Sequence, residues 1–389
     1  MHILPRRSVS LPGLVVALVT LLACATPSSQ AQAQAQAQAP ASDDQRAARL
    51  VQALGLREAA TPISQSPGWR KPSRILVLGV PADRLAWLQA VAPGVELVAA
   101  NSSSEEQAAA ARADAVIGTC AAGVISAGPN IRWVQTYNAG VERCLTSSIF
   151  TERGILLTNM QRVAGPAMAE HVMALMLSFA RSLPAYHDAQ RRSAWDRTPP
   201  GASAAFTLEG KTVLVVGLGG IGTEVARRAH AFGMTVLATR ATPRPAPDFV
   251  SEVGLAADLT RFTPRADFVV NTLPLTPDTQ GQFDAKVFAT MKQGAHFFNV
   301  GRGATVVTAD LVEALRSGRI AGAGLDVVDP EPLPSSSPLW SMPNVIITPH
   351  SSSDSDVDEE SRWLVVRENL RRYVAGERML SVVDPSRGY

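Results

Sequence analysis

Short apolar runs alternate with segments of helical spacing along two stretches of the chain. The first stretch starts at Arg74 and predicts strands at 75–80, 95–99 and 115–118 and helices at 83–91 and 104–111. The second starts at Lys211 and predicts strands at 212–216, 235–238, 268–271, 296–300, 323–326 and 345–348 and helices at 221–232 and 309–317. Such alternation is typical of parallel strands joined by helices. We therefore predict an α/β fold with two doubly wound parallel-sheet domains.

Two further segments predict how these domains connect. Residues 163–186 are apolar and rich in Ala, Met and Leu, so we expect a helix that leaves the first domain for the second. Residues 354–373 are acidic at the start and apolar and basic later, which suits a helix that returns to the first domain. The predicted architecture is a Rossmann cofactor domain, residues 196–351, inserted in a discontinuous flavodoxin-like substrate domain, residues 71–195 and 352–389.

The N-terminal residues 1–25 resemble a signal peptide. Arg6 and Arg7 precede an apolar run over 11–22, which is too short to span a bilayer comfortably, and small residues follow it. Two kinds of processing remain open: ordinary cleavage after an alanine, or lipidation of Cys24 in a lipoprotein-like box. Residues 5–11 also resemble a twin-arginine signal, which exports proteins already folded. We expect an exported protein that is periplasmic or lipid-anchored.

Residues 26–70 are expected to be a low-complexity linker and N-terminal extension. Alanine and glutamine alternate over 31–39 and Pro40 follows, so this segment has no large apolar group with which to build a core. Globular structure should begin after it.

Charge and cysteine spacing limit the kinds of partner. In 389 residues, 36 Lys and Arg stand against 34 Asp and Glu, and a net charge of +2 gives no field that would gather nucleic acid or coat an anionic membrane. Cys24, Cys120 and Cys144 lack metal-ligand spacing, and we expect neither a metal site nor a disulfide framework. The partners should be small molecules, with membrane contact only through lipid on Cys24.

A glycine-rich turn predicts a dinucleotide site. Gly217, Gly219 and Gly222 have GxGxxG spacing directly after the predicted strand 212–216. Gly217 would tighten the turn, Gly219 would let the backbone approach a pyrophosphate, and Gly222 would let helix and strand pack closely. The pyrophosphate would lie at the helix N-terminus, which is formed by Gly220, Ile221 and Gly222.

The end of the following strand bears on the choice of nucleotide. An Asp or Glu there would bind the adenosine ribose of NAD, but the chain has Thr239 and Arg240. A guanidinium can form paired charge-assisted hydrogen bonds with the 2′-phosphate of NADP, and Thr239 could add a hydroxyl. We predict NADP as the preferred cofactor. A solvated surface arginine, with NAD bound less selectively, remains the alternative.

Five motifs, in order along the chain, carry a resemblance to a known family. They are Gly217–Gly222, Asn299–Gly303, Gly324–Val327, Asp329–Leu333 and Thr348–His350. Together they resemble the D-isomer-specific 2-hydroxyacid dehydrogenase family, over about residues 74–376. The resemblance implies an NAD(P)-dependent enzyme that interconverts small 2-keto acids, such as glyoxylate or hydroxypyruvate, and D-2-hydroxy acids. It also implies a homodimer.

The resemblance implies Arg302, Glu331 and His350 as the catalytic triad, and the chemistry agrees. Arg302 follows an apolar strand and can hold the carboxylate of a 2-keto acid with two hydrogen bonds. His350 follows strand 345–348 and can donate a proton to the ketone oxygen as that oxygen gains negative charge. Glu331 would orient the imidazole and stabilise its protonated form.

The remaining site residues follow from the resemblance. The substrate carboxylate would be bound by Arg302 and by the loop Asn138, Ala139 and Gly140. In this loop the backbone amides of Ala139 and Gly140 would be the donors. The further cofactor contacts would be Leu273, Pro274, Thr279, Val300, Gly301, Arg302, Asp326 and His350. Of these, Asp326 would receive the nicotinamide amide. A non-catalytic dinucleotide-sensing protein on the same scaffold remains open, because an exported reductase lacks an obvious supply of reduced cofactor.

Overall fold

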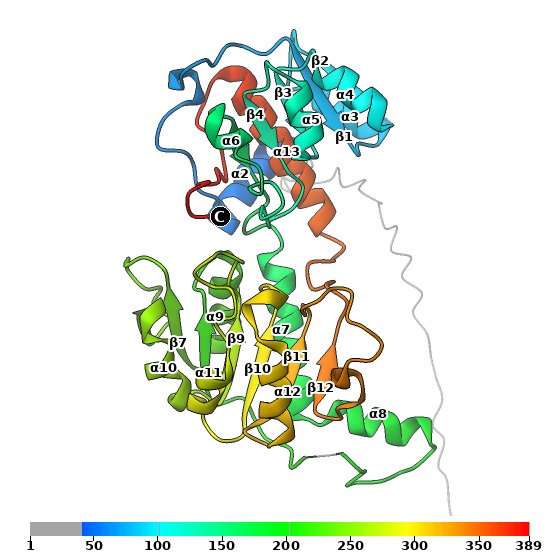
Figure 1. Ribbon diagram of the computed structural model, residues 1–389, viewed down its shortest axis with the longest axis vertical. Helices are drawn as coiled ribbons and strands as arrows, with labels where there is room; N and C mark the ends of the chain where they lie inside the picture. The colour runs from blue at the N-terminus through cyan, green and yellow to red at the C-terminus, as the bar shows by residue number, and fades with distance from the viewer. Residues whose placement is uncertain (1–40, 101, 202, 389) are drawn as a thin grey trace, which may run out of the picture. The chain divides into compact units, whose positions relative to one another are not determined.

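The computed structural model describes residues 41–100, 102–201 and 203–388 (Figure 1). The predicted signal segment, Cys24 and the alanine–glutamine stretch lie in residues 1–40, outside the described residues. Among the residues it does describe, no helix has the length and apolar character needed to cross a membrane.

Within the described ranges, the first sheet has five parallel strands in the order β2-β1-β3-β4-β5. The strands are β1 Arg74–Leu78, β2 Glu96–Ala100, β3 Ala115–Ile117, β4 Trp133–Gln135 and β5 Leu156–Thr158. The helices that accompany them are α2 Asp43–Leu54, α3 Ala82–Gln89, α4 Ser103–Ala110, α5 Ala122–Ala127, α6 Ile149–Glu152 and α13 Asp358–Ala375. This is the flavodoxin-like strand order.

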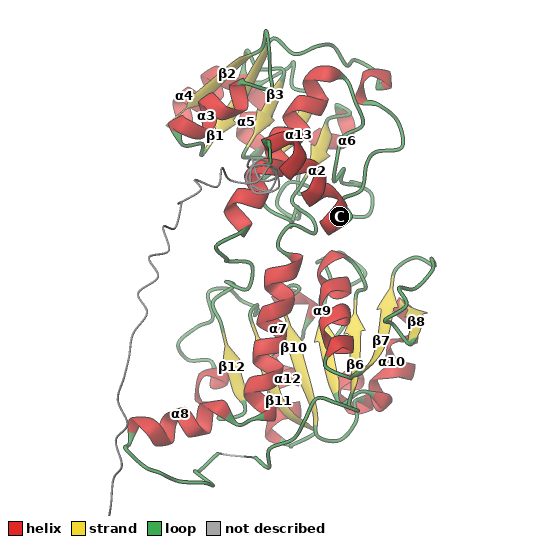
Figure 2. Cartoon of the chain, turned by 180° about the vertical axis from the view of Figure 1, so that it is seen from behind, coloured by secondary structure: helices red, strands yellow, loops and turns green. Residues whose placement is uncertain are grey.

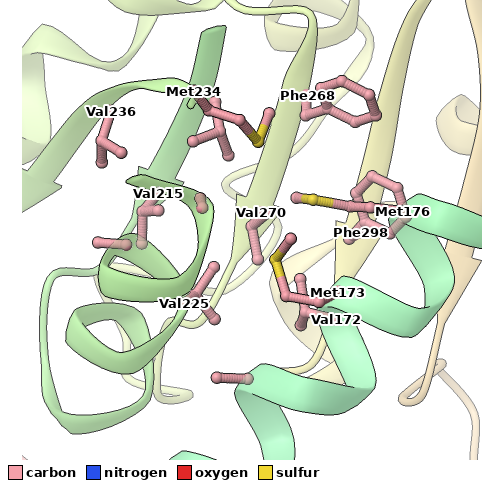
Figure 3. Packing of buried hydrophobic residues seen from close by; sticks show 14 of the residues in the cluster. Val172, Met173, Met176, Val215, Val225, Met234, Val236, Phe268, Val270 and Phe298 are labelled. Carbon is pink, nitrogen blue, oxygen red and sulfur yellow. The ribbon is translucent and has the colours of Figure 1, made fainter. Parts of the chain in front are cut away.

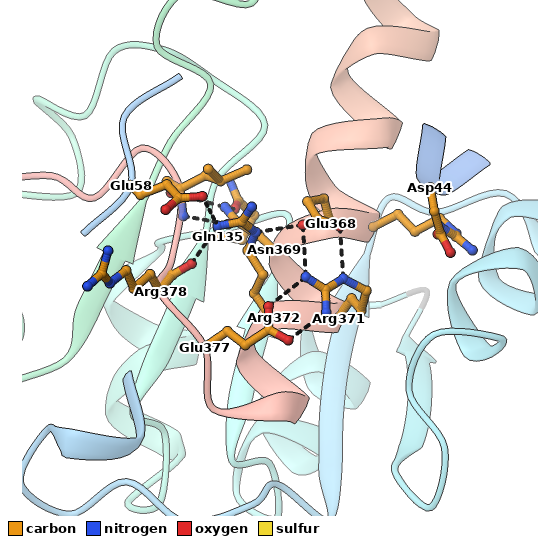
Figure 4. Close-up of polar contacts among 11 residues, drawn as sticks. Asp44, Glu58, Gln135, Glu368, Asn369, Arg371, Arg372, Glu377 and Arg378 are labelled. Carbon is orange, nitrogen blue, oxygen red and sulfur yellow. Dashed lines mark hydrogen bonds and ion pairs between the residues drawn. The ribbon is translucent and has the colours of Figure 1, made fainter. Parts of the chain in front are cut away.

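Helix α13 returns to the first sheet from the far end of the sequence. Val366 and Tyr373 of α13 share a buried cluster with Ile75 of β1 and Trp133 of β4. A polar network accompanies this packing: Asn369 donates a hydrogen bond to Gln135 at 2.8 Å, and Arg371 and Arg372 both bond Glu368 (Figure 4). The substrate domain is therefore discontinuous, as the fold prediction required.

The N-terminal extension differs from its predicted linker character. Residues 43–54 form α2, and its Arg46 lies 2.8 Å from Glu360 of α13, while Asp44 pairs with Arg367. Leu50 and Leu54 pack against the same apolar cluster as α13. Globular structure thus begins soon after the alanine–glutamine stretch, inside the segment 26–70 that was assigned to linker and extension, because α2 has an apolar face that the low-complexity stretch lacks.

Among the described residues, the second sheet has seven parallel strands in the order β12-β11-β10-β9-β6-β7-β8. The strands are β6 Thr212–Val216, β7 Thr235–Arg240, β8 Glu252–Leu255, β9 Phe268–Asn271, β10 Ala295–Asn299, β11 Ile320–Leu325 and β12 Val345–Ile347. The helices are α7 Gly165–Ala180, α8 Leu183–Arg191, α9 Gly220–Ala231, α10 Leu259–Phe262, α11 Ala285–Thr290 and α12 Thr308–Arg316. The order is that of a Rossmann fold with one added edge strand, so the predicted fold class is confirmed.

Helices cover both faces of the second sheet. α7 and α9 lie side by side on one face (Figure 2), where Met173 and Met176 of α7 pack near Val270 and Phe298 of the strands (Figure 3). α11 and α12 cover the other face, where they pack in one buried cluster with Phe297 of β10. Strands buried on both faces read as continuous apolar runs, which is why the sequence revealed them.

The apolar segment 163–186 needs a correction. It forms two helices, α7 and α8, which are separated at Arg181 and Ser182, where Ser182 has a left-handed φ of 51°. The buried face of α7 belongs to the core of the second sheet. The chain therefore joins the core of the second sheet at α7, well before residue 195, the boundary predicted from the sequence.

The cysteine spacing did not suggest a disulfide framework, but the structure has one disulfide among the described residues. Cys120 and Cys144 are joined by a disulfide across a sequence separation of 24. Cys120 follows β3 and Cys144 lies beyond β4, and these two strands are parallel neighbours in the first sheet. Sequence spacing carried no sign of this proximity, since it depends on strand order.

Candidate active site

The glycine-rich turn has the geometry that a pyrophosphate needs. Gly217 follows β6 with a φ of 100°, and α9 begins at Gly220, so Gly220, Ile221 and Gly222 form its first turn. A Cβ on Gly222 would overlap the carbonyl oxygen of Gly217. The nearest atom to a Cβ on Gly219 would be 4.0 Å away, so the backbone there is open to a ligand. Free amides at a helix N-terminus beside an open glycine form an anion site, and these residues fit a dinucleotide.

Thr239 and Arg240 end the strand next to this turn. The Thr239 carbonyl accepts hydrogen bonds from the amides of Gly217 and Leu218, at 3.2 and 2.8 Å, and so holds the turn. Arg240 is only 5% exposed, and its Nη1 donates to the carbonyls of Arg244 and Pro245. Its buried Nε has no hydrogen-bond partner among the described residues, and burial lowers the pKa of Arg240.

Arg240 is therefore not a solvated surface arginine, and that part of the alternative is wrong. A buried cation with an unsatisfied donor is stabilised by an anion, and a 2′-phosphate is the anion that this position in the fold would receive. The residues present fit NADP.

The loops after β9 and β10 are held together by a buried amide network. Asn271 donates to Asn299 at 3.0 Å, and Asn299 accepts from the Gly301 amide at 3.1 Å. A Cβ on Gly301 would be 2.5 Å from the carbonyl oxygen of Leu273, so only glycine allows this close approach. The network fixes the two loops that carry the predicted cofactor residues.

The other predicted cofactor residues of these loops have structural partners. Val300 is fully buried under the second sheet. Thr279 donates to the Pro274 carbonyl at 2.7 Å and accepts from the Thr276 amide, which closes the loop that includes Pro274. Contacts of Val300, Pro274 and Thr279 with a nucleotide stay predictions.

Glu331 and His350 form the acid–imidazole pair that the sequence suggested. Glu331 Oε2 lies 3.0 Å from His350 Nδ1, and Glu331 Oε1 accepts from the Val328 amide at 3.0 Å. Half of the His350 side chain is exposed, and its backbone has a left-handed φ of 54°. A non-glycine residue in that conformation is strained, and such strain persists where surrounding contacts enforce it. Nδ1 is engaged by Glu331, which leaves Nε2 as the nitrogen that can exchange a proton with a substrate.

Asp326 enforces the conformation of the His350 loop. Its Oδ1 accepts from Thr348 Oγ1 at 2.6 Å and from the Ser351 amide at 3.0 Å, and its carboxylate also accepts from the Ser352 amide. The residue is 2% exposed. Its carboxylate is thus engaged by the loop, and the predicted contact with the nicotinamide amide stays a prediction.

Arg302 lies beside the glycine loop that follows β4. Its Nε donates to Glu142 Oε1 at 2.8 Å and its Nη1 to the Gly301 carbonyl at 2.7 Å. A Cβ on Gly140 would overlap Nη2 of Arg302. The structure thus brings together Arg302 and the loop predicted to bind the substrate carboxylate.

The glycine loop offers main-chain donors. The carbonyls of Asn138 and Ala139 accept hydrogen bonds from the Met160 amide and the Asn159 side chain. Within the described residues, the amides of Ala139 and Gly140 form no hydrogen bond to another protein group. Two free amides beside a guanidinium are suited to a carboxylate.

Sequence reasoning missed two contacts that hold this site. Glu142, two residues after Gly140, forms an ion pair with Arg302. Thr348 links Asp326 to His171, whose Nε2 lies 3.0 Å from the Thr348 hydroxyl. Both links join segments that are far apart along the chain, so local spacing could not reveal them.

Comparison with known proteins identifies the family. The family model described as D-isomer specific 2-hydroxyacid dehydrogenase, NAD binding domain, matches residues 173–352. The mouse glyoxylate reductase/hydroxypyruvate reductase is 37% identical over 259 residues, which are 66% of this chain and 78% of that protein. The glyoxylate/hydroxypyruvate reductase B of Citrobacter koseri is 33% identical over 323 residues, 81% of this chain and 98% of that protein.

A solved structure gives the same family. The D-isomer specific 2-hydroxyacid dehydrogenase of Xanthobacter autotrophicus, in complex with NADPH and MES, aligns with a TM-score of 0.71 and 32% identity. The alignment covers 82% of this chain and all of that chain. Since sequence relatives and fold agree over 78% to 100% of the length of these proteins, the chain belongs to the D-isomer-specific 2-hydroxyacid dehydrogenase family.

Proposed function

We propose that the protein is an NADPH-preferring reductase that converts a small 2-keto acid to a D-2-hydroxy acid. The observation that carries this proposal is the Glu331–His350 pair at 3.0 Å in a chain that also places Arg302 beside the free amides of Ala139 and Gly140. The buried Arg240 supports NADP over NAD. A related NADPH-dependent glyoxylate/hydroxypyruvate reductase from Sinorhizobium meliloti, 31% identical with a TM-score of 0.68 over 82% of this chain and all of its own, was solved with NADP and sulfate.

Each side chain has a separate task in the proposed reaction. Arg302 and the amides of Ala139 and Gly140 bind the substrate carboxylate and fix the orientation of the ketone. His350 Nε2 donates a proton to the ketone oxygen as negative charge develops there, and Glu331 holds the ring and balances its positive charge. Bound NADPH supplies the hydride. In the reverse direction, neutral His350 accepts the hydroxyl proton.

A substrate panel tests the proposal. NADPH and NADH oxidation should be followed with glyoxylate, hydroxypyruvate, pyruvate and bulkier 2-keto acids. We expect turnover that is faster with NADPH. Absence of turnover with every keto acid, while the nucleotide still binds, would refute the proposal and favour a non-catalytic dinucleotide-binding protein.

We also propose that the protein is exported. Support comes from the signal-like residues 1–25 and from the Cys120–Cys144 disulfide, a bond that persists in oxidising compartments and is rare in the cytosol. Changing Arg6 and Arg7 to Lys should block export if the twin-arginine route is used. Metabolic labelling with a fatty acid, with Cys24→Ser as the control, tests whether Cys24 carries lipid.

A homodimer is the proposed assembly. Trp195 is completely exposed, and Leu183 and Tyr186 of α8 lie 51% and 40% exposed close to it in the sequence. Exposed large apolar side chains in one segment mark an interaction site. Light scattering after gel filtration should give twice the mass of the chain, and Trp195→Ser should shift the mass toward that of a monomer.

A further inference from the structure

The Cys120–Cys144 disulfide connects two loops that leave the same edge of the first sheet. Cys120 follows the end of β3 at Ile117, and Cys144 lies in the turn beyond the glycine loop that follows β4. β3 and β4 pair in parallel through Val116 and Val134, so both loops leave from the carboxyl ends of the strands. The carboxyl ends of parallel strands are where such sheets bind ligands.

Cys144 anchors a tight turn that contains Glu142. The Cys144 amide donates to the Val141 carbonyl at 2.9 Å, and the Leu145 amide donates to the carbonyls of Val141 and Glu142. Val141 is 2% exposed and Cys144 is 3% exposed, so one side of the turn is buried. The turn is therefore held by its own hydrogen bonds, by apolar burial and by the disulfide.

Glu142 connects this turn to Arg302 through an ion pair. The ion pair between Glu142 Oε1 and Arg302 Nε is 2.8 Å long, and both side chains are 27% exposed. Because a Cβ on Gly140 would overlap Nη2 of Arg302 and lie 2.7 Å from Glu142 Oε2, the three residues are in close contact. Glu142 occupies the Nε side of the guanidinium and the Gly301 carbonyl accepts from Nη1, which fixes the plane in which the guanidinium can meet a substrate.

We propose that the Cys120–Cys144 disulfide is a positioning element of the substrate-carboxylate site, which acts through Glu142 on Arg302. The cysteines and Glu142 are positioning residues, since they act through the guanidinium. Loss of the disulfide lets the turn shift, and small shifts in a bidentate site weaken carboxylate binding strongly. This inference rests on the proposed function, because it assigns the substrate carboxylate to Arg302.

Steady-state kinetics of the full chain in a Cys24→Ser background test the inference, since Cys120 and Cys144 are then the remaining cysteines. Peptide mapping without reductant first establishes the crosslink in the parent. Cys120→Ala with Cys144→Ala should raise KM for the keto acid about tenfold and lower kcat by a smaller factor, about threefold, because a displaced guanidinium weakens carboxylate binding and only partly reorients the ketone. The Kd for NADPH should not change. Glu142→Ala should raise the same KM to a similar extent.

A double-mutant cycle separates positioning from general destabilisation. If the disulfide acts through Glu142, the variant lacking both cysteines and Glu142 should be no worse than either alone, since coupled effects are non-additive. Leu157→Ala, in the same buried cluster but away from the turn, is the matched control: it should lower the melting temperature and leave KM unchanged. Additive effects, an unchanged KM without the cysteines, or an equal KM rise in Leu157→Ala would each overturn the inference.

Two further measurements cover a variant that does not fold and a parent without activity. If the cysteine variant does not fold, the folded parent treated with dithiothreitol replaces it, and an unchanged KM after reduction overturns the inference. If the parent turns over no keto acid, the proposed function fails. Oxamate binding to the NADPH complex, measured by calorimetry, then decides: weaker binding without the disulfide supports the positioning role, and equal binding overturns it.

Discussion

His296 should make the folded protein less stable in mild acid. It is the second residue of β10, and its ring lies among aromatic rings, with centroid distances of 5.6 Å to Phe268, 5.1 Å to Phe179 and 5.9 Å to Phe206. Burial lowers the pKa of His296 from its ordinary value of 6.5 to about 4. Burial disfavours the charged imidazolium, so the folded state holds the neutral ring.

The sign and size of the effect follow from linkage. Well above pH 6.5 the ring is neutral in both the folded and the unfolded state, so His296 does not make stability depend on pH there. As the pH falls from 6.5 to 4, the unfolded chain binds a proton that the folded chain does not, so the free energy of unfolding decreases. A lowering of about 2.5 pKa units corresponds to at most about 3 kcal/mol over this window.

Urea unfolding of the wild type and His296→Phe between pH 7.5 and 4 measures the effect. Phe keeps an aromatic ring in the cluster and removes the titrating group, so its advantage over the wild type should grow by up to about 3 kcal/mol as the pH falls. Phe288→Leu is the control: it removes a ring from the other buried cluster of the second sheet and leaves the rings around His296 in place, so it should lower stability and keep the pH dependence of the wild type. A free-energy difference between wild type and His296→Phe that does not change from pH 7 to 4 would refute the reasoning.

Three other substitutions test the site. Gly222→Ala places a Cβ on the Gly217 carbonyl oxygen and should abolish NADPH binding in a fluorescence titration; unchanged affinity would contradict the assigned turn. Arg240→Asp should raise KM for NADPH about 10- to 100-fold and shift preference toward NADH, since it removes a charge-assisted contact; a constant ratio of kcat/KM for the two cofactors would exclude the 2′-phosphate role. His350→Ala should lower kcat about 10²- to 10⁴-fold while calorimetry shows normal NADPH binding; near-normal turnover would remove His350 from the proton transfer.

Much of the fold could be predicted because it depends on local pattern. Strands β6, β7, β9, β10 and β11 of the second sheet are mostly apolar and buried, and their runs and the GxGxxG turn could be read directly. β4, β5 and β8, at Trp133–Gln135, Leu156–Thr158 and Glu252–Leu255, were missed. The break at Ser182 was missed because Leu183, Ala185 and Tyr186 extend the apolar run, although α8 beyond them is mostly polar.

The sequence by itself determined the order of most elements and the glycine turn, because apolar runs and glycine spacing are local patterns, and its motifs carried the family resemblance that implies Arg302, Glu331 and His350 as the triad. Only the tertiary structure decided which of these groups meet. In the tertiary structure Glu142 forms an ion pair with Arg302, and Asp326 holds the His350 loop by hydrogen bonds. Arg240 is buried, and a disulfide joins Cys120 to Cys144. The physical reason is that a parallel sheet brings the carboxyl ends of its strands to one edge in an order set by long-range packing, which no local period encodes.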